Sequence, residues 1–157
     1  MLTPLLALWA VSTAQMPDTT ARVRHGAARQ ALNDSIAAVQ AAAVAFRVDL
    51  GTASSDLVLA RARRLRERCA AARRAARSLA LLLADAPLPA SERRARRDLA
   101  ELERVLQKCE RDYDPGAPGV NADTLKAWGP FRLNQLELEL RRYAPGVQRL
   151  PGAPGTR

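Results

Sequence analysis

The two cysteines of this chain constrain its fold more than any other feature of the sequence. Cys69 and Cys109 lie at nearly equal distances on either side of a turn that contains Pro87 and Pro89. Two prolines so close together end a helix on each side, because proline lacks a backbone donor and restricts the residue before it. A helix rises about 1.5 Å per residue, so equal spacing from the turn places both cysteines at one height in an antiparallel hairpin. The spacing therefore predicts a Cys69–Cys109 disulfide and an oxidising compartment.

Apolar residues recur at spacings of three and four in three stretches, which is the pattern of amphipathic helices. Both cysteines fall on these apolar seams, so they face a common core. Gly51 follows the first stretch and predicts a left-handed end for that helix. The seams consist of Leu32, Ile36, Val39, Ala43, Phe46 and Leu50; of Val58, Ala62, Leu65, Cys69, Ala72, Ala76, Leu79 and Leu83; and of Ala95, Leu99, Leu102, Leu106, Cys109 and Tyr113.

A fourth helix is predicted from Asn121 or Asp123 to Tyr143. Gly129-Pro130 interrupts it, so the helix either kinks there or splits in two. Its inner face is predicted to contain Leu125, Trp128, Leu133, Leu136, Leu140 and Tyr143.

Short connections between the predicted helices favour antiparallel neighbours. Alanine, leucine and arginine dominate the composition while β-branched residues are scarce, so we expect no strand. The sequence predicts an all-α, up-down helical bundle of coiled-coil character over residues 20–143, with three long helices and a kinked or split fourth. Proline and glycine in residues 144–157 predict a disordered tail.

The first residues predict an export signal. An apolar run over residues 2–11 leads into Ser12-Thr13-Ala14, a small-x-small pattern that a signal peptidase accepts. We expect a signal peptide over residues 1–14, a short mature segment over residues 15–19, and a periplasmic or secreted protein. The run is short for a membrane span, and no positive charge precedes it except the α-amino group. A weak signal or a misassigned start stays an alternative.

The sequence offers no set of residues for catalysis, for a metal or for a cofactor. His25 is the only histidine, and the chain contains neither a Cys-x-x-Cys pair nor a glycine-rich phosphate loop. We therefore expect a non-enzymatic protein without a metal or a cofactor.

Arginine carries almost all of the positive charge, since Lys108 and Lys126 are the only lysines in a chain of net charge +9. The arginines gather in the second predicted helix and at the start of the third, whereas acidic residues gather in residues 101–114. This pattern predicts a charge dipole along the hairpin. Guanidinium groups bind carboxylates and phosphates through two parallel hydrogen bonds. The predicted anionic-partner surface consists of Arg61, Arg64, Arg68, Arg73, Arg74, Arg77, Arg93, Arg94, Arg96 and Arg97.

The plain interpretation of these arginines is a solvated helix face. The functional interpretation is a contact with an anionic envelope component or an acidic protein. Nucleic acid is the least favoured partner, because no aromatic residues interleave with the arginines and export removes the chain from the chromosome. A cytoplasmic nucleic-acid-binding protein is the alternative if the N-terminal run is not a signal.

Four aromatic residues are predicted to meet at the end of the bundle that carries the Gly51 loop. They are Phe46, Tyr113, Trp128 and Phe131. Such a cluster caps the core or lines a pocket, so a small-ligand carrier is a second alternative. The helical seams could also pair between two chains, which leaves a homo-oligomer open.

Overall fold

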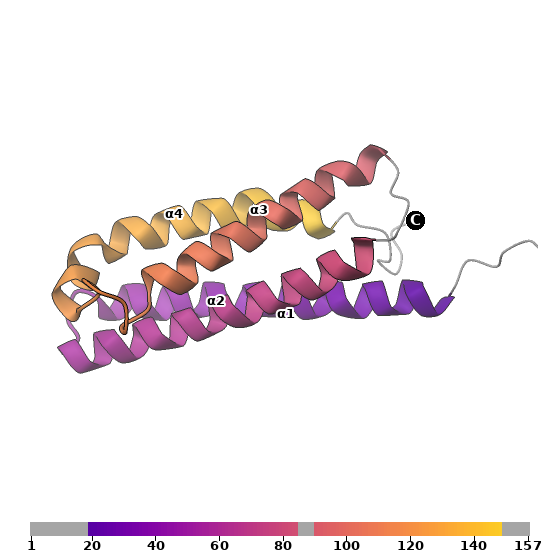
Figure 1. Cartoon of the computed structure of the whole chain (residues 1–157). Helices are drawn as coiled ribbons and strands as arrows, with labels where there is room; N and C mark the ends of the chain where they lie inside the picture. Colours follow the sequence, from indigo (N-terminus) through magenta and orange to yellow (C-terminus); the bar gives the residue numbers. More distant parts are fainter. Residues whose placement is uncertain (1–18, 85–89, 149–157) are drawn as a thin grey trace, which may run out of the picture.

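Four long helices make up the part of the chain that the computed structural model describes, residues 19–84 and 90–148. Each helix packs on the next in chain order, and α1 also packs on α4. Successive helices run in opposite directions (Figure 1). The predicted all-α, up-down bundle is confirmed. The helices are α1 (Thr19–Asp49), α2 (Ser55–Ala84), α3 (Ala90–Asp112) and α4 (Ala122–Gln148).

The core follows the predicted seams. In α2 the buried residues are the members of the predicted seam without exception. All members of the α3 seam are buried, and so are those of the α1 seam apart from Ala43, which is partly buried. In α4 the four leucines of the predicted inner face are buried, whereas Trp128 and Tyr143 pack against the core at its edge. A periodic apolar face was therefore sufficient to identify most of the core.

The predicted disulfide joins α2 to α3. Cys69 and Cys109 are both buried, and their Cα atoms are 6.1 Å apart, within the usual range for a disulfide. Helix axes normally lie about 8 to 10 Å apart, a separation that small interface residues reduce. Ala72 and Ala76 of α2 are fully buried near this bridge and allow the close approach.

The start of α4 and the end of α1 are stabilised in different ways. Asn121 and Thr124 cap α4 reciprocally: the Thr124 N–H donates to Asn121 Oδ1 at 2.9 Å, and the Asn121 N–H donates to Thr124 Oγ1 at 2.9 Å. After α1, however, Gly51 does not adopt the predicted left-handed conformation. In the described part of the chain that conformation occurs at Gly119, whose φ is 79°. The α1 end instead closes through ordinary turns.

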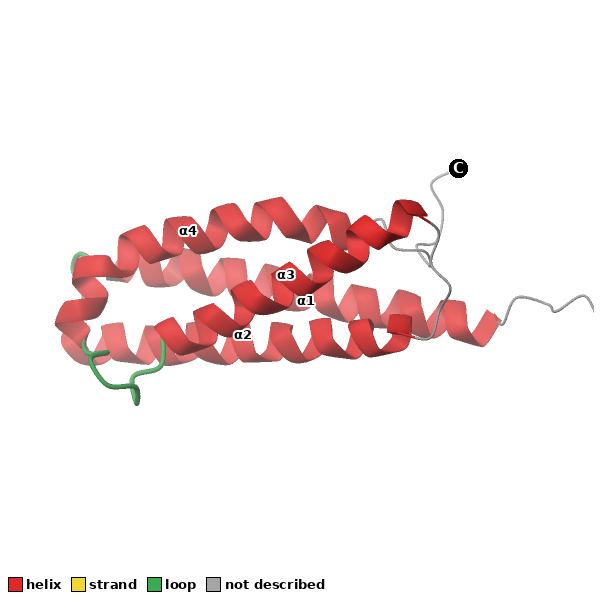
Figure 2. Cartoon of the chain, turned by 45° about the horizontal axis from the view of Figure 1, so that its top comes forward, coloured by secondary structure: helices red, strands yellow, loops and turns green. Residues whose placement is uncertain are grey.

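Helix α4 continues through both of its prolines. Pro130 lies inside the helix, and Figure 2 shows the first turns bent relative to the rest, so the helix kinks and does not split. The predicted tail began too early, because α4 passes Pro145 and ends at Gln148. The reason is packing: Val147 is fully buried, and continuing the helix past Pro145 places this side chain in the core. The predicted signal peptide, residues 15–18 and residues 149–157 lie outside the described part of the chain.

The last turn of α4 depends on a glycine. A Cβ atom at Gly146 would lie 2.9 Å from Asp98 Cβ on α3 and even closer to the Asp98 carboxylate. Gly146→Ala should therefore destabilise the fold by about 2 kcal/mol through overpacking, measured by urea unfolding. Gly51→Ala is the matched control, because nothing lies within 4 Å of its added Cβ. A loss of stability in Gly51→Ala equal to that in Gly146→Ala would contradict the close approach.

Candidate functional site

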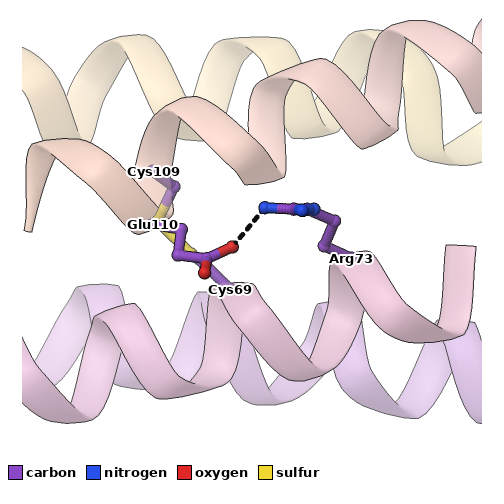
Figure 3. The surroundings of a disulfide bond; sticks show 4 residues. All are labelled: Cys69, Arg73, Cys109 and Glu110. Carbon is purple, nitrogen blue, oxygen red and sulfur yellow. Dashed lines mark hydrogen bonds and ion pairs between the residues drawn. A yellow bond between two sulfur atoms is a disulfide. The ribbon is translucent and has the colours of Figure 1, made fainter. Parts of the chain in front are cut away.

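Three arginines on one side of α2 face α3 and are ion-paired with its carboxylates. The N–O distances are 3.5 Å for Arg66–Asp114, 2.7 Å for Arg73–Glu110 and 3.1 Å for Arg77–Glu103. Figure 3 shows the Arg73–Glu110 pair beside the disulfide. Arg73 and Arg77, two members of the predicted anionic-partner surface, therefore have partners within the fold, although the Arg77 side chain stays 62% exposed.

The same pairs contradict the predicted charge dipole along the hairpin. In an antiparallel hairpin, residues before the turn lie beside residues an equal distance after it. The acidic residues 103–114, of α3 and the loop that follows it, therefore lie alongside the arginines of residues 66–77 in α2. Positive and negative charges are matched across the α2–α3 interface, and they are not separated along it.

Two further arginines of the predicted surface also have internal partners. Arg61 Nε lies 2.6 Å from Asp49 Oδ2 and joins α2 to the end of α1. Arg96 on α3 donates hydrogen bonds to the Leu83 and Ala84 carbonyl oxygens at the end of α2. A cation at that position satisfies terminal carbonyls and complements the helix dipole. Arg61 and Arg96 thus have structural roles.

The remaining arginines of the predicted surface are exposed. In residues 19–84 and 90–148 these side chains form no ion pair or hydrogen bond. Two more arginines of α2 and α3 share this state: Arg63, which lies on α2 within the basic run, and Arg111, which sequence reasoning missed. A seven-residue spacing, Arg97-Arg104-Arg111, could have found Arg111 as part of one helix face. The unpaired arginines of α2 and α3 are Arg63, Arg64, Arg68, Arg74, Arg93, Arg94, Arg97 and Arg111.

The unpaired arginines are spread along the length of the bundle. The contact of Arg96 with Leu83 places the start of α3 beside the end of α2. Arg93, Arg94 and Arg97 therefore lie near that end, whereas Arg64 lies in the other half of α2, toward the α1–α2 loop (Figure 1). The predicted surface thus consists of an α2 group and an α3 group at different heights of the bundle.

A groove between α1 and α2 lies beside the α2 group. Its volume is about 280 Å³, and alanine side chains of α1 form one side of it while arginines of α2 form the other. We refer to it as the α1–α2 groove. Its lining residues are Ala38, Ala41, Ala42, Ala45, Arg61, Arg64 and Arg68.

The predicted aromatic cluster contains three of its four members. The Tyr113 ring lies 5.6 Å from that of Phe46 and 5.8 Å from that of Trp128, between centroids. Arg132 stacks over Trp128 at 5.6 Å. Phe131 is 69% exposed and lies outside the cluster, so this part of the prediction was wrong. Leu133, two residues later, is buried, and residues two apart on a helix do not share a face, so Phe131 points outward.

Space beside this cluster is small. The cavity bordered by Tyr113, Cys109 and Arg132 has a volume of about 10 Å³, enough for about one water molecule. Burial raises the pKa of the Tyr113 phenol well above its ordinary value, and the Asp112 carboxylate raises it further. The hydroxyl has no hydrogen-bond partner in the structure. Pockets for organic ligands are typically about 300 Å³ or larger, so this cavity does not favour a ligand carrier.

Among the described residues there is neither a membrane-spanning helix nor a group of metal ligands. No helix among α1 to α4 is long and apolar enough to cross a membrane. Within those same helices and their loops, no three His, Cys, Asp or Glu side chains gather as metal ligands would.

Comparison of the chain with protein-family models, with curated proteins and with solved structures finds no match.

Proposed function

We propose that this chain is an exported, non-enzymatic helical bundle that binds an anionic partner through the unpaired arginines of α2 and α3. The observation that carries the proposal is the set of exposed guanidinium groups that the fold leaves without counter-charges. Several other arginines of the same helices are ion-paired within the fold. The exposed set differs from them in having no such internal carboxylate partner among the described residues. Guanidinium is weakly hydrated and binds carboxylate or phosphate in a bidentate manner, which suits it to such contacts.

Export is supported by two independent features. The disulfide belongs to oxidising compartments such as the periplasm or the extracellular space. The apolar run of residues 2–11, followed by Ser12-Thr13-Ala14, is typical of a cleaved signal. The anionic partner is therefore proposed to be an envelope component or an acidic protein of that compartment.

The proposal predicts salt-sensitive binding to polyanions. The oxidised protein should bind heparin and phosphatidylglycerol vesicles at about 20 mM salt and lose most of that affinity at about 200 mM, because screening weakens contacts between exposed charges. Isothermal titration or vesicle co-sedimentation measures this. Absence of binding at low salt, or affinity that is independent of salt, would contradict the proposed function.

Matched variants test whether the arginines of α3 contribute. Arg93→Gln, Arg94→Gln and Arg97→Gln together should weaken polyanion binding by about tenfold or more. The control variant removes the same charge elsewhere, through Arg24→Gln, Lys126→Gln and Arg142→Gln. An equal loss in both variants would show that net charge alone drives binding and would overturn the assignment to α2 and α3.

A further inference from the structure

The α1–α2 groove combines an apolar surface with unpaired positive charge. Four alanines of α1 line the groove, and their methyl side chains project only a short distance from the helix. They are Ala38, Ala41, Ala42 and Ala45. On the opposite side, Arg64 and Arg68 are exposed and unpaired, whereas Arg61 is bound to Asp49. An occupant of the groove thus meets an apolar side and a charged side together.

A second groove, between α1 and α4, provides a comparison. Its volume is similar, about 260 Å³, but both of its arginines are ion-paired, because Glu137 pairs with Arg47 and with Arg141. The α1–α2 groove has no such carboxylate in its lining. Charge complementarity therefore distinguishes the two grooves and points to an anionic occupant for the α1–α2 groove alone.

The spacing of the groove's residues matches a helix. Arg64 and Arg68 lie one turn apart on α2, and carboxylates at positions i and i+4 of a partner helix have the same spacing of about 5 to 6 Å. The alanines span residues 38–45, which is about 10 Å, or two helical turns. Small side chains also allow a helix of a partner to approach α1 closely.

The geometry points to an acidic amphipathic helix of a partner protein as the occupant of the α1–α2 groove. Its carboxylates bind Arg64 and Arg68, while its small apolar residues lie on the α1 alanines. This inference rests on the proposed function and names its partner class. Alanine methyl groups offer too little apolar area to hold an acyl chain, and a phosphate polymer gains nothing from an apolar floor. The arrangement therefore favours a protein helix over either.

The test uses a synthetic helix as the probe. A stapled peptide of about 14 residues, roughly four turns, carries glutamates at i, i+4 and i+7 and alanine or leucine beside them on the same face. A second stapled peptide of the same composition distributes its glutamates around the helix. The folded, oxidised full chain should bind the first peptide at least about tenfold more tightly than the second, measured by fluorescence anisotropy. Equal binding of both peptides would overturn the inference.

Variants locate the binding. Arg64→Gln with Arg68→Gln should weaken binding of the first peptide by about tenfold, because each loses a charge-assisted contact. Arg24→Gln with Arg142→Gln removes the same charge outside α2 and α3 and should change it by less than about twofold. Ala41→Trp fills the groove without changing charge, and Ala41 is exposed, so the variant should fold and still lose binding. Equal losses from the two arginine pairs, or full binding by Ala41→Trp, would overturn the groove assignment.

Two further probes separate this inference from the proposed function. Phosphatidylglycerol vesicles and inorganic polyphosphate should bind Ala41→Trp as well as they bind the parent protein, since neither needs the groove. Loss of their binding in Ala41→Trp would assign the groove to lipid or to a polyanion and overturn the helix occupant. Salt-sensitive vesicle binding without selective peptide binding would leave the proposed function standing and refute this inference.

Discussion

Replacement of both cysteines by alanine should destabilise the folded chain by about 4 kcal/mol. The disulfide closes a loop with a sequence separation of 40, and in the chain-entropy model a loop of this length restricts the unfolded state by that amount. Urea unfolding of Cys69→Ala with Cys109→Ala, compared with the oxidised parent, measures the difference. A loss this large is comparable to the whole stability of many small domains.

Ion pairs across the same interface are individually much weaker than the disulfide. The pair Arg73–Glu110 is partly exposed, and exposed or half-exposed ion pairs contribute about 0 to 1 kcal/mol each. The variant Arg73→Gln is therefore the control and should change stability by no more than about 1 kcal/mol. Equal stability of the parent protein and the cysteine-free variant would contradict the role of the disulfide. Free thiols at Cys69 and Cys109 in protein isolated from its host would also contradict export.

The helices and the core could be predicted because they depend on local patterns. The seam of α2 was identified completely, since its apolar residues follow the helical period without interruption. The disulfide followed from one more step, because an antiparallel hairpin relates positions by their distance from the turn. These features need no knowledge of how side chains far apart in the sequence meet.

The end of α4 could not be predicted in this way. Pro145 and Gly146 are typical of a loop, and local propensity favours ending the helix before them. Their tertiary environment decides otherwise, because Val147 is buried and Gly146 allows α3 to approach. Packing outweighs propensity at that turn, and packing between α3 and α4 is not visible in a single stretch of sequence.

The candidate surface was predicted only in part for a related reason. The sequence shows the number of arginines on a helix and the face on which each lies. Whether each positive charge is paired depends on the residues of the neighbouring helix. Arg66, Arg73 and Arg77 face α3 and meet carboxylates, whereas Arg64 and Arg68 face the α1 alanines and meet none. The alternation of neighbours around α2 therefore determines which arginines stay available for a partner.

Tyr113 is the second position at which we expect a large effect. Its ring is buried between Phe46 and Trp128, and truncation to alanine removes those contacts and leaves a cavity. Tyr113→Ala should destabilise the chain by about 3 to 5 kcal/mol, measured by urea unfolding. The exposed aromatic Phe131 provides the control, because Phe131→Ala should cost less than about 1 kcal/mol. Similar losses at both positions would contradict the central place of Tyr113 in the cluster.

The hydroxyl of Tyr113 should behave differently from its ring. It is buried without a hydrogen-bond partner, so Tyr113→Phe removes an unsatisfied polar group and should stabilise the chain by about 1 kcal/mol near neutral pH. A clear destabilisation by Tyr113→Phe would instead show that the hydroxyl has a partner in solution.

Alkaline pH should enlarge the difference between Tyr113→Phe and the parent protein. The pKa of Tyr113 is raised in the folded state by burial and then by Asp112, whereas in the unfolded chain it lies near the ordinary value of about 10. Below that value the phenol is protonated in both states, so stability is unaffected by its titration. Above it, the unfolded state loses the proton first and the parent protein loses about 1.4 kcal/mol of stability per pH unit until the folded pKa is reached. Tyr113→Phe lacks this loss, so its advantage in urea unfolding should grow between about pH 9 and about pH 11. An advantage that stays constant over this range would show that the phenol ionises equally in both states and is not buried as the structure has it.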